Sequence, residues 1–181
     1  ERRECVILFA DVIGFSRFAE KRDPQEVMRF LNQFHYIATS QIGAYGGIVE
    51  KYIGDAVMAS FAAFDDLEHP AANAYCAAQA NGGAPLEIGV GLNFGPAVVG
   101  DIGQREAVTP AVIGATVNLA ARLEKATREL GSDAVLSEQF ANRLHSEVPV
   151  AAPTLLARYG QTQTIQVKGF SEPVRVFFNN C

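Results

Sequence analysis

The hydrophobic positions of this chain alternate between runs typical of strands and runs with helical spacing. Residues 5–10 are continuously apolar, as expected for a central strand that is buried on both faces. Residues 48–53 and 56–61 form two β-rich arms around Gly54-Asp55, which predicts a tight hairpin. Residues 86–93 alternate strictly, and their non-apolar face carries two glycines, which would let another group approach closely.

The remaining pattern predicts an alternation of further strands and helices. An aspartate cap and a first-turn proline at Asp23-Pro24 begin a helix, whose apolar residues recur at helical spacing up to residue 38. Other helices are expected from His69-Pro70 to about residue 81, over residues 114–129, and from Ser137. Strands are expected over residues 97–102, after a turn at Gly95-Pro96, and over residues 108–113, 133–136, 155–168 and 174–178.

Composition describes one globular domain. A length of 181 residues, with 49% hydrophobic and 19% charged residues, is enough for a well-buried core. The net charge of −5 argues against a nucleic-acid partner, because a phosphate backbone requires clustered Lys and Arg. The three cysteines and three histidines are scattered, so neither a zinc site nor a disulfide framework is expected. With no signal peptide or long apolar run, we expect a cytoplasmic domain that makes no membrane contact itself and belongs to a longer protein.

Two aspartates are the first candidate functional residues. Asp11 ends the apolar run of residues 5–10, and Asp55 lies at the tip of the hairpin, where an aspartate is also an ordinary turn residue. If the two strands are neighbours and end together, the carboxylates lie side by side and repel each other unless a cation neutralises them. The pair therefore suggests a metal site. Lys51, in the first arm of the same hairpin, adds a cation nearby.

Two further segments could bind an anionic ligand. Residues 11–16 contain Gly14 and a hydroxyl, the composition of a backbone-amide anion cradle, but they lack the lysine of a P-loop. In the helix of residues 114–129, Asn118 and Arg122 are four residues apart and share a face, while leucines and an alanine line another face. Taken alone, Asn118 and Arg122 are better explained as the solvated side of an amphipathic helix.

Four strings occur together in an order and spacing that change this interpretation. They are Phe9-Ala-Asp-Val-Ile-Gly-Phe-Ser16, residues 47–61, Val112-Ile-Gly-Ala-Thr-Val-Asn-Leu-Ala-Ala-Arg-Leu-Glu124, and Val167-Lys-Gly169. In combination they resemble the catalytic domain of class III nucleotidyl cyclases, the adenylyl and guanylyl cyclases, of bacterial adenylyl type. The resemblance extends over residues 5–178 and makes residues 1–181 a single catalytic domain.

The resemblance implies an α+β fold, a ferredoxin-like α/β sandwich with a mostly antiparallel central sheet and flanking helices. It also implies a head-to-tail homodimer with two active sites at the interface. By resemblance, Asp11, Asp55 and the carbonyl of Val12 bind two divalent cations, Mg²⁺ or Mn²⁺. The ligand set agrees with this, since hard cations prefer carboxylate and carbonyl oxygens.

The same resemblance assigns the nucleotide contacts. Asn118 and Arg122 match the catalytic positions that orient the ribose and stabilise charge on the α-phosphate, and Lys51 matches the base-contacting lysine of adenylyl cyclases. The remaining contacts match positions that bind the triphosphate: the amides of Ile13, Gly14, Phe15 and Ser16, and the side chains of Arg105 and Lys168.

The implied activity is conversion of ATP to 3′,5′-cyclic AMP and pyrophosphate. The chain departs from the family pattern at Ala111, where an Asp or Thr usually contacts the adenine amino group, and at Ala115, where an Asp is common. Because Ala111 accepts no hydrogen bond, the adenylyl assignment rests on Lys51, and a guanylyl cyclase acting on GTP is the first alternative. A non-catalytic nucleotide-binding or dimerisation module of the same fold is the second.

Overall fold

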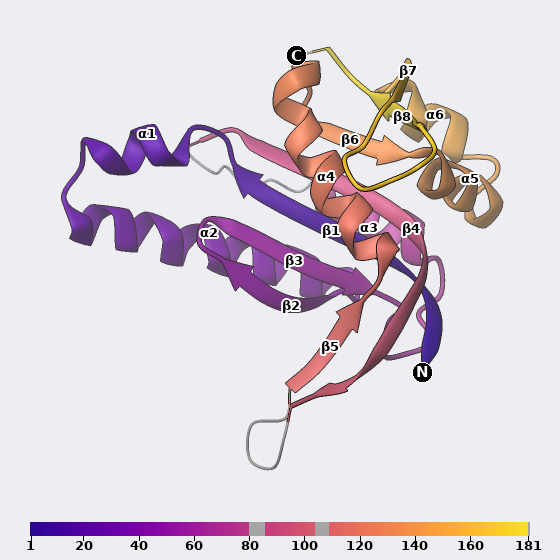
Figure 1. Cartoon of the computed structure of the whole chain (residues 1–181), viewed down its shortest axis with the longest axis horizontal. Helices are drawn as coiled ribbons and strands as arrows, with labels where there is room; N and C mark the ends of the chain where they lie inside the picture. Colours follow the sequence, from indigo (N-terminus) through magenta and orange to yellow (C-terminus); the bar gives the residue numbers. More distant parts are fainter. Residues whose placement is uncertain (80–85, 104–108, 181) are drawn as a thin grey trace.

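The computed structural model describes residues 1–79, 86–103 and 109–180, which form one eight-stranded sheet with helices on both faces (Figure 1). The strands are β1 (Arg2–Val12), β2 (Ile48–Ile53), β3 (Ala56–Phe61), β4 (Ile88–Ile102), β5 (Thr109–Ile113), β6 (Ala134–Ser137), β7 (Gln161–Ile165) and β8 (Val174–Phe178). The helices are α1 (Phe15–Glu20), α2 (Pro24–Ala44), α3 (Pro70–Gln79), α4 (Ala115–Leu130), α5 (Glu138–Glu147) and α6 (Ala152–Ala157).

The strand order is β2-β3-β1-β4-β6-β8-β7, and β5 pairs with β4 outside this path. Among the registered pairs, only β4 with β6 is parallel. The sequence β1, α2, β2, β3, α3, β4 with the spatial order β2-β3-β1-β4 is the ferredoxin-like arrangement. The predicted α+β class with a mostly antiparallel sheet is confirmed.

Strand β1 is buried on both faces, as its continuous apolar run predicts. Val6, Leu8 and Ala10 belong to the core cluster that includes α2, α3 and α5, while Cys5 and Ile7 belong to a second cluster with Ala120 of α4. Figure 1 shows α4 crossing the sheet on the side opposite α2. The end of β1 that carries Asp11 therefore lies between two helical layers.

The glycine-bearing face of β4 is covered by α4. A Cβ at Gly91 would lie only 2.3 Å from the carbonyl oxygen of Ala120 and 2.3 Å from the amide nitrogen of Glu124, and a Cβ at Gly89 would lie 2.5 Å from Oγ1 of Thr127. The close approach expected from these glycines is thus made by a helix of the same chain. It fixes α4, and with it the side chains that α4 presents, against the centre of the sheet.

The predicted turn at Gly95-Pro96 is wrong, because β4 continues through it. Gly95 and Pro96 pair with Cys5 and Glu4 of β1. Proline is tolerated here because β6 pairs only with residues 90–92 of β4, and β5 pairs only with residues 98–102. Between them β4 has a single neighbouring strand, so the missing N–H of Pro96 removes no ladder hydrogen bond on that side.

Two more predicted boundaries need correction. Residues 155–168 were expected as one strand, but residues 155–157 end helix α6 and only Gln161–Ile165 form β7. A short apolar run such as this does not separate helix from strand by periodicity. Helix α1 was not expected at all; it begins at Phe15, directly after the loop that follows β1. The predicted end of the second helix near residue 81 lies outside the described residues.

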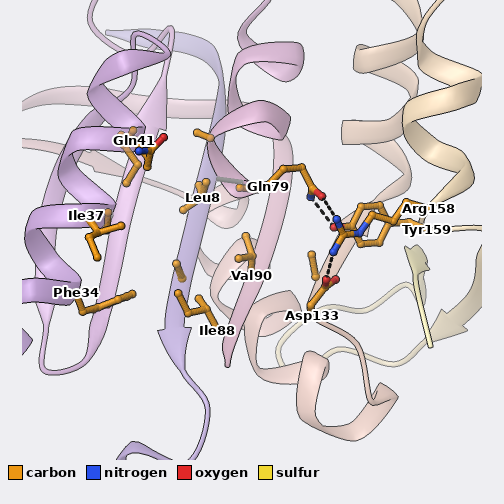
Figure 2. Close-up of a pocket in the computed structure, with 16 residues that line it drawn as sticks. Leu8, Phe34, Ile37, Gln41, Gln79, Ile88, Val90, Asp133, Arg158 and Tyr159 are labelled. Atoms are coloured by element: carbon orange, nitrogen blue, oxygen red, sulfur yellow. Dashed lines mark hydrogen bonds and ion pairs between the residues drawn. The ribbon is translucent and has the colours of Figure 1, made fainter. Parts of the chain in front are cut away.

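A cavity of about 250 Å³ lies between α2, α3 and the sheet (Figure 2). In Figure 2, Phe34 and Ile37 of α2 face Leu8 of β1 and Val90 of β4, so most of the lining is apolar. At one end Arg158 donates to Gln79 Oε1 at 2.5 Å and forms an ion pair with Oδ2 of Asp133, whereas the buried Oδ1 of Asp133 has no hydrogen-bond partner among the described residues. No helix within residues 1–79, 86–103 and 109–180 is long and apolar enough to cross a membrane.

Candidate active site

Asp11 and Asp55 lie together at one edge of the sheet. β1 and β3 are antiparallel neighbours, and Asp11 pairs with Ala56, the residue directly after Asp55. Gly54, with φ 63°, forms the tight turn that places Asp55 beside the end of β1. Both aspartates line a concavity of about 450 Å³ together with Val12, Gly14, Phe15 and Ser16.

The electrostatics of this pair suit a divalent cation. Burial, followed by the neighbouring Asp11 carboxylate, raises the pKa of Asp55 to about 6. Oδ1 of Asp11 is buried and has no hydrogen-bond partner among the described residues. An orphaned carboxylate oxygen beside a second, destabilised carboxylate fits the oxygen donor set of Mg²⁺ or Mn²⁺. In the described part of the chain no third His, Cys, Asp or Glu converges on the pair, and Mg²⁺ commonly uses only one or two protein carboxylates.

The other oxygen of Asp11 is held by α4. Nη2 of Arg128 donates to Oδ2 of Asp11 at 2.7 Å, and Nη1 of the same guanidinium donates to Oε1 of Glu124. The Glu124 side chain is only 4% exposed, whereas that of Arg128 is 36% exposed. Arg128 therefore bridges a carboxylate inside the core and a carboxylate at the candidate metal site.

The turn that carries Asp55 is held by α2. Nε2 of His35 lies 3.2 Å from the carbonyl oxygen of Gly54, and the His35 ring packs on Tyr52 at 4.3 Å between centroids. The hydroxyls of Tyr52 and Thr39 are 2.5 Å apart, which ties β2 to the same helix. His35 is thus a structural residue of the turn.

The amide loop differs in one position from the expectation. The amide of Ile13 donates to the carbonyl of Glu87 at 2.8 Å, so in this conformation it is not available to a phosphate. Gly14 adopts φ 78° and is the N-cap of α1. The amides of Phe15 and Ser16 belong to the first turn of α1, whose N–H groups have no intrahelical acceptor.

A second concavity gathers a different set of predicted residues. Asn118 and Arg122 of α4, together with Lys168, line a hollow of about 540 Å³. All three side chains are exposed. Lys125, one turn after Arg122, lines both this hollow and the one with the aspartates. The opposite side of α4 packs inward through Leu119, Leu123 and Ala126, as the helical pattern predicted.

Besides Ile13, two predicted residues, Lys51 and Ala111, line neither concavity. Lys51 is exposed on β2, after a register shift between Val49 and Lys51. Ala111 lies on β5, paired with Gly100, in the β4–β5 hairpin that extends away from the sheet in Figure 1. Arg105 lies outside the described residues. One chain thus contains two separate groups of candidate residues, and the two base-contact positions are away from both.

Sequence reasoning did not find Glu124, Arg128 or His35. Glu124 and Arg128 form an acid-to-base pair at i, i+4, a signal that is visible in the sequence but that usually marks an exposed helix face. The contact with Asp11 is made by Arg128 and joins residues that are 117 positions apart in the sequence. Only the packing of α4 against β4 brings the two together.

With this geometry described, comparison with known proteins identifies the family. A family model described as adenylate and guanylate cyclase catalytic domain matches residues 1–179. The chain belongs to this family. It is 29% identical over 196 residues to an adenylate cyclase of Anabaena cylindrica, in an alignment that covers 97% of this chain and 36% of the relative. The chain thus spans about a third of the length of the curated relatives that it matches.

Solved cyclase structures share the fold over nearly the whole chain. The guanylyl cyclase Cya2 superimposes with a TM-score of 0.81 at 27% identity, covering 98% of this chain and 92% of that one. The adenylyl cyclase CyaB from P. aeruginosa superimposes with a TM-score of 0.79 at 26% identity, covering 98% and 94%. A guanylyl and an adenylyl cyclase are therefore almost equally similar, and overall similarity does not distinguish ATP from GTP.

Proposed function

We propose that this domain converts ATP to 3′,5′-cyclic AMP and pyrophosphate at two composite sites of a homodimer. The observation that carries the proposal is the pair Asp11 and Asp55, with an orphaned carboxylate oxygen, in a chain that belongs to the nucleotidyl cyclase family. In this proposal Asp11, Asp55 and the carbonyl of Val12 hold two divalent cations. Bound there, such ions would activate the ribose 3′-hydroxyl and neutralise the triphosphate.

The chain's own residues would orient the nucleotide and stabilise charge. The 3′-hydroxyl passes its proton to the triphosphate of the substrate, and its oxygen forms a bond to the α-phosphorus. The bond from that phosphorus to the pyrophosphate oxygen breaks, and the proton leaves with pyrophosphate. Arg122 places its positive charge beside the α-phosphate, where negative charge develops in the transition state. An interaction of this type contributes about 3–4 kcal/mol. Asn118 orients the ribose, and Lys168, with Arg105, binds the triphosphate alongside the amides of Gly14, Phe15 and Ser16.

ATP is the proposed substrate because of Lys51. An ammonium group can donate to N1 of adenine, whereas guanine has a donor at that position and would leave both donors unpaired. Ala111 supplies no second contact, and GTP is the alternative substrate. Lys51 and Ala111 lie apart from the metal and ribose groups of the same chain, which favours a site completed by a second subunit.

A second candidate function is a non-catalytic nucleotide-binding module. The retention of Asp11, Asp55, Asn118, Arg122 and Lys168 speaks against it, because a module that only binds or dimerises does not need the groups that act on the reacting phosphate.

One assay separates these functions. Purified domain is incubated with ATP or with GTP, each with Mn²⁺, and the products are separated by liquid chromatography and identified by mass spectrometry. Cyclic AMP and pyrophosphate in equal amounts support the proposal, and cyclic GMP as the main product would replace ATP with GTP. Nucleotide that binds, by a shift in thermal unfolding, but remains intact would establish the non-catalytic module.

A further inference from the structure

Arg128 links a buried carboxylate, that of Glu124, to Asp11 of the candidate metal site. Glu124 and Arg128 are one turn apart on α4, and Arg128 reaches from Oε1 of Glu124 to Oδ2 of Asp11, the latter at 2.7 Å. Arg128 also donates to the backbone carbonyl of Glu124 at 3.4 Å. Two contacts within α4 thus fix the position of the guanidinium that contacts Asp11.

Glu124 cannot readily move away. Its backbone lies on the α4 face that packs against β4, where a Cβ at Gly91 would meet the Glu124 nitrogen at 2.3 Å. Glu124 is only 3% exposed. This burial raises the pKa of its carboxyl group, and the adjacent Arg128 offsets part of that rise. A carboxylate in such a place needs a cationic partner, because an unpaired buried charge is costly. The partner that the structure provides is Arg128.

We propose that Arg128, anchored by Glu124, is the positioning residue of the metal site. It holds the Asp11 carboxylate by Oδ2 and leaves the buried, unpartnered Oδ1 as the oxygen offered to a divalent cation. This inference rests on the proposed function, since it takes Asp11 as a metal ligand.

The pair acts through orientation more than through charge. The guanidinium of Arg128 and the carboxylate of Glu124 carry opposite unit charges, so together they add no net charge to the site. What they add is a fixed, planar, two-ended contact, which a lysine ammonium does not reproduce. Removing a partner that orients a metal ligand in this way typically lowers the metal affinity by about 10- to 100-fold.

The experiment measures Mn²⁺ binding alone, without nucleotide, from the electron paramagnetic resonance signal of free Mn²⁺. We expect Arg128→Met to raise the Kd for Mn²⁺ by about 10-fold or more, and Arg128→Lys to give an intermediate value. The Mn²⁺ concentration for half-maximal turnover should shift by the same factor, while the KM for ATP at saturating Mn²⁺ stays near that of the wild type.

The chain offers a closely matched control. Arg143 and Glu147 form an i, i+4 ion pair on α5, in the reverse order along the helix, with side-chain exposures of 37% and 4% against 36% and 4% for Arg128 and Glu124. Arg143→Met removes a comparable ion pair away from the aspartates. It should lower the free energy of unfolding without changing the Kd for Mn²⁺, so a purely structural effect is recognised.

A charge-balanced variant keeps the test decisive if Arg128→Met folds poorly. Glu124→Gln with Arg128→Met leaves neither an unpaired buried carboxylate nor a change in net charge, and it should still weaken Mn²⁺ binding. Unchanged or tighter binding in this variant or in Arg128→Met would overturn the proposal, since Arg128 would then be a bystander or a competing cation. Asp11→Asn in the wild-type background tests the underlying function separately: if it leaves Mn²⁺ binding intact, the metal assignment itself fails.

Discussion

At the scale of single residues, Asp55 has opposite effects on stability and on the proposed activity. Its folded-state pKa of about 6 lies above the ordinary value of 3.8, so the folded, metal-free domain holds this proton more tightly than the unfolded chain does. The contribution of Asp55 to stability therefore falls as the pH rises from about 4 through 6. Above that range a charged Asp55 destabilises the metal-free fold, because burial and Asp11 oppose its ionisation.

Asp55→Asn removes this charge and keeps the shape of the side chain. Without metal, the variant should unfold at a higher temperature than the wild type at pH 7.5, and the difference should vanish at about pH 3, where Asp55 is neutral in both the folded and the unfolded state. Calorimetry in EDTA at the two pH values measures this. Turnover should fall by orders of magnitude, and added Mn²⁺ should stabilise only the wild type. A less stable Asp55→Asn protein at pH 7.5 would show that the two carboxylates do not repel each other.

Lys51 is the residue on which the choice of base depends. The wild type should show a higher kcat/KM for ATP than for GTP, but only by about 10-fold, since a single hydrogen bond contributes about 1–3 kcal/mol and Ala111 adds none. Lys51→Met should remove most of this preference by lowering kcat/KM for ATP, with little change for GTP. Side-by-side kinetics with both nucleotides test it. A wild-type preference for GTP would reject the adenylyl assignment and retain the cyclase one.

At the scale of elements, the sequence predicted what depends on local pattern. The run that became β1, the hairpin at Gly54-Asp55 and the inward face of α4 were all recognisable from periodicity and turn chemistry. The proximity of Asp11 and Asp55 could also be predicted, because it requires only that their two strands are neighbours and have these ends at the same edge of the sheet. The family resemblance supplied the remaining candidate residues.

The errors arose where tertiary packing decides. Pro96 was taken for a turn because proline is rare inside sheets, and only the limited pairing of β6 and β5 with β4 shows why it is tolerated. The glycine face of β4 indicated a close neighbour but not that the neighbour is α4. The contact between Arg128 and Asp11 depends on that same packing, and so it was not visible in the pattern.

The cavity beneath α2 gives a prediction about how its lining elements pack. Ala38 lines the cavity of about 250 Å³, so Ala38→Leu should fill part of it and raise the free energy of unfolding by about 0.5–2 kcal/mol. Ala120 is the opposite case: it is fully buried where α4 meets Gly91, and Ala120→Leu should be destabilising by about 1–3 kcal/mol. Urea denaturation of both variants decides. A destabilising Ala38→Leu would mean that the space is already filled in solution.

At the scale of the whole molecule, the candidate site residues of one chain are divided among separate places and do not form one complete site. The aspartates line one concavity, Asn118, Arg122 and Lys168 line another, and Lys51 and Ala111 line neither. The β4–β5 hairpin also exposes three aliphatic side chains, Val98, Ile102 and Ile113, which are 51%, 53% and 46% exposed. Exposed apolar side chains gathered on one projecting element are typical of an association surface. Both features favour sites that are completed between two copies of the chain.

Mixing two inactive variants tests this arrangement. In an isologous dimer with shared sites, Asp55→Ala and Arg122→Ala each damage both sites of their homodimers, whereas a mixed dimer has one site with both lesions and one intact site. Random exchange makes about half of the dimers mixed, with one good site in two, so activity should recover to about a quarter of the wild-type value. Asp11→Ala mixed with Asp55→Ala is the matched control, because both lesions fall in the same group of residues and no intact site can form. If the first mixture stays inactive although labelled subunits demonstrably exchange, each site lies within one chain and the composite dimer is rejected.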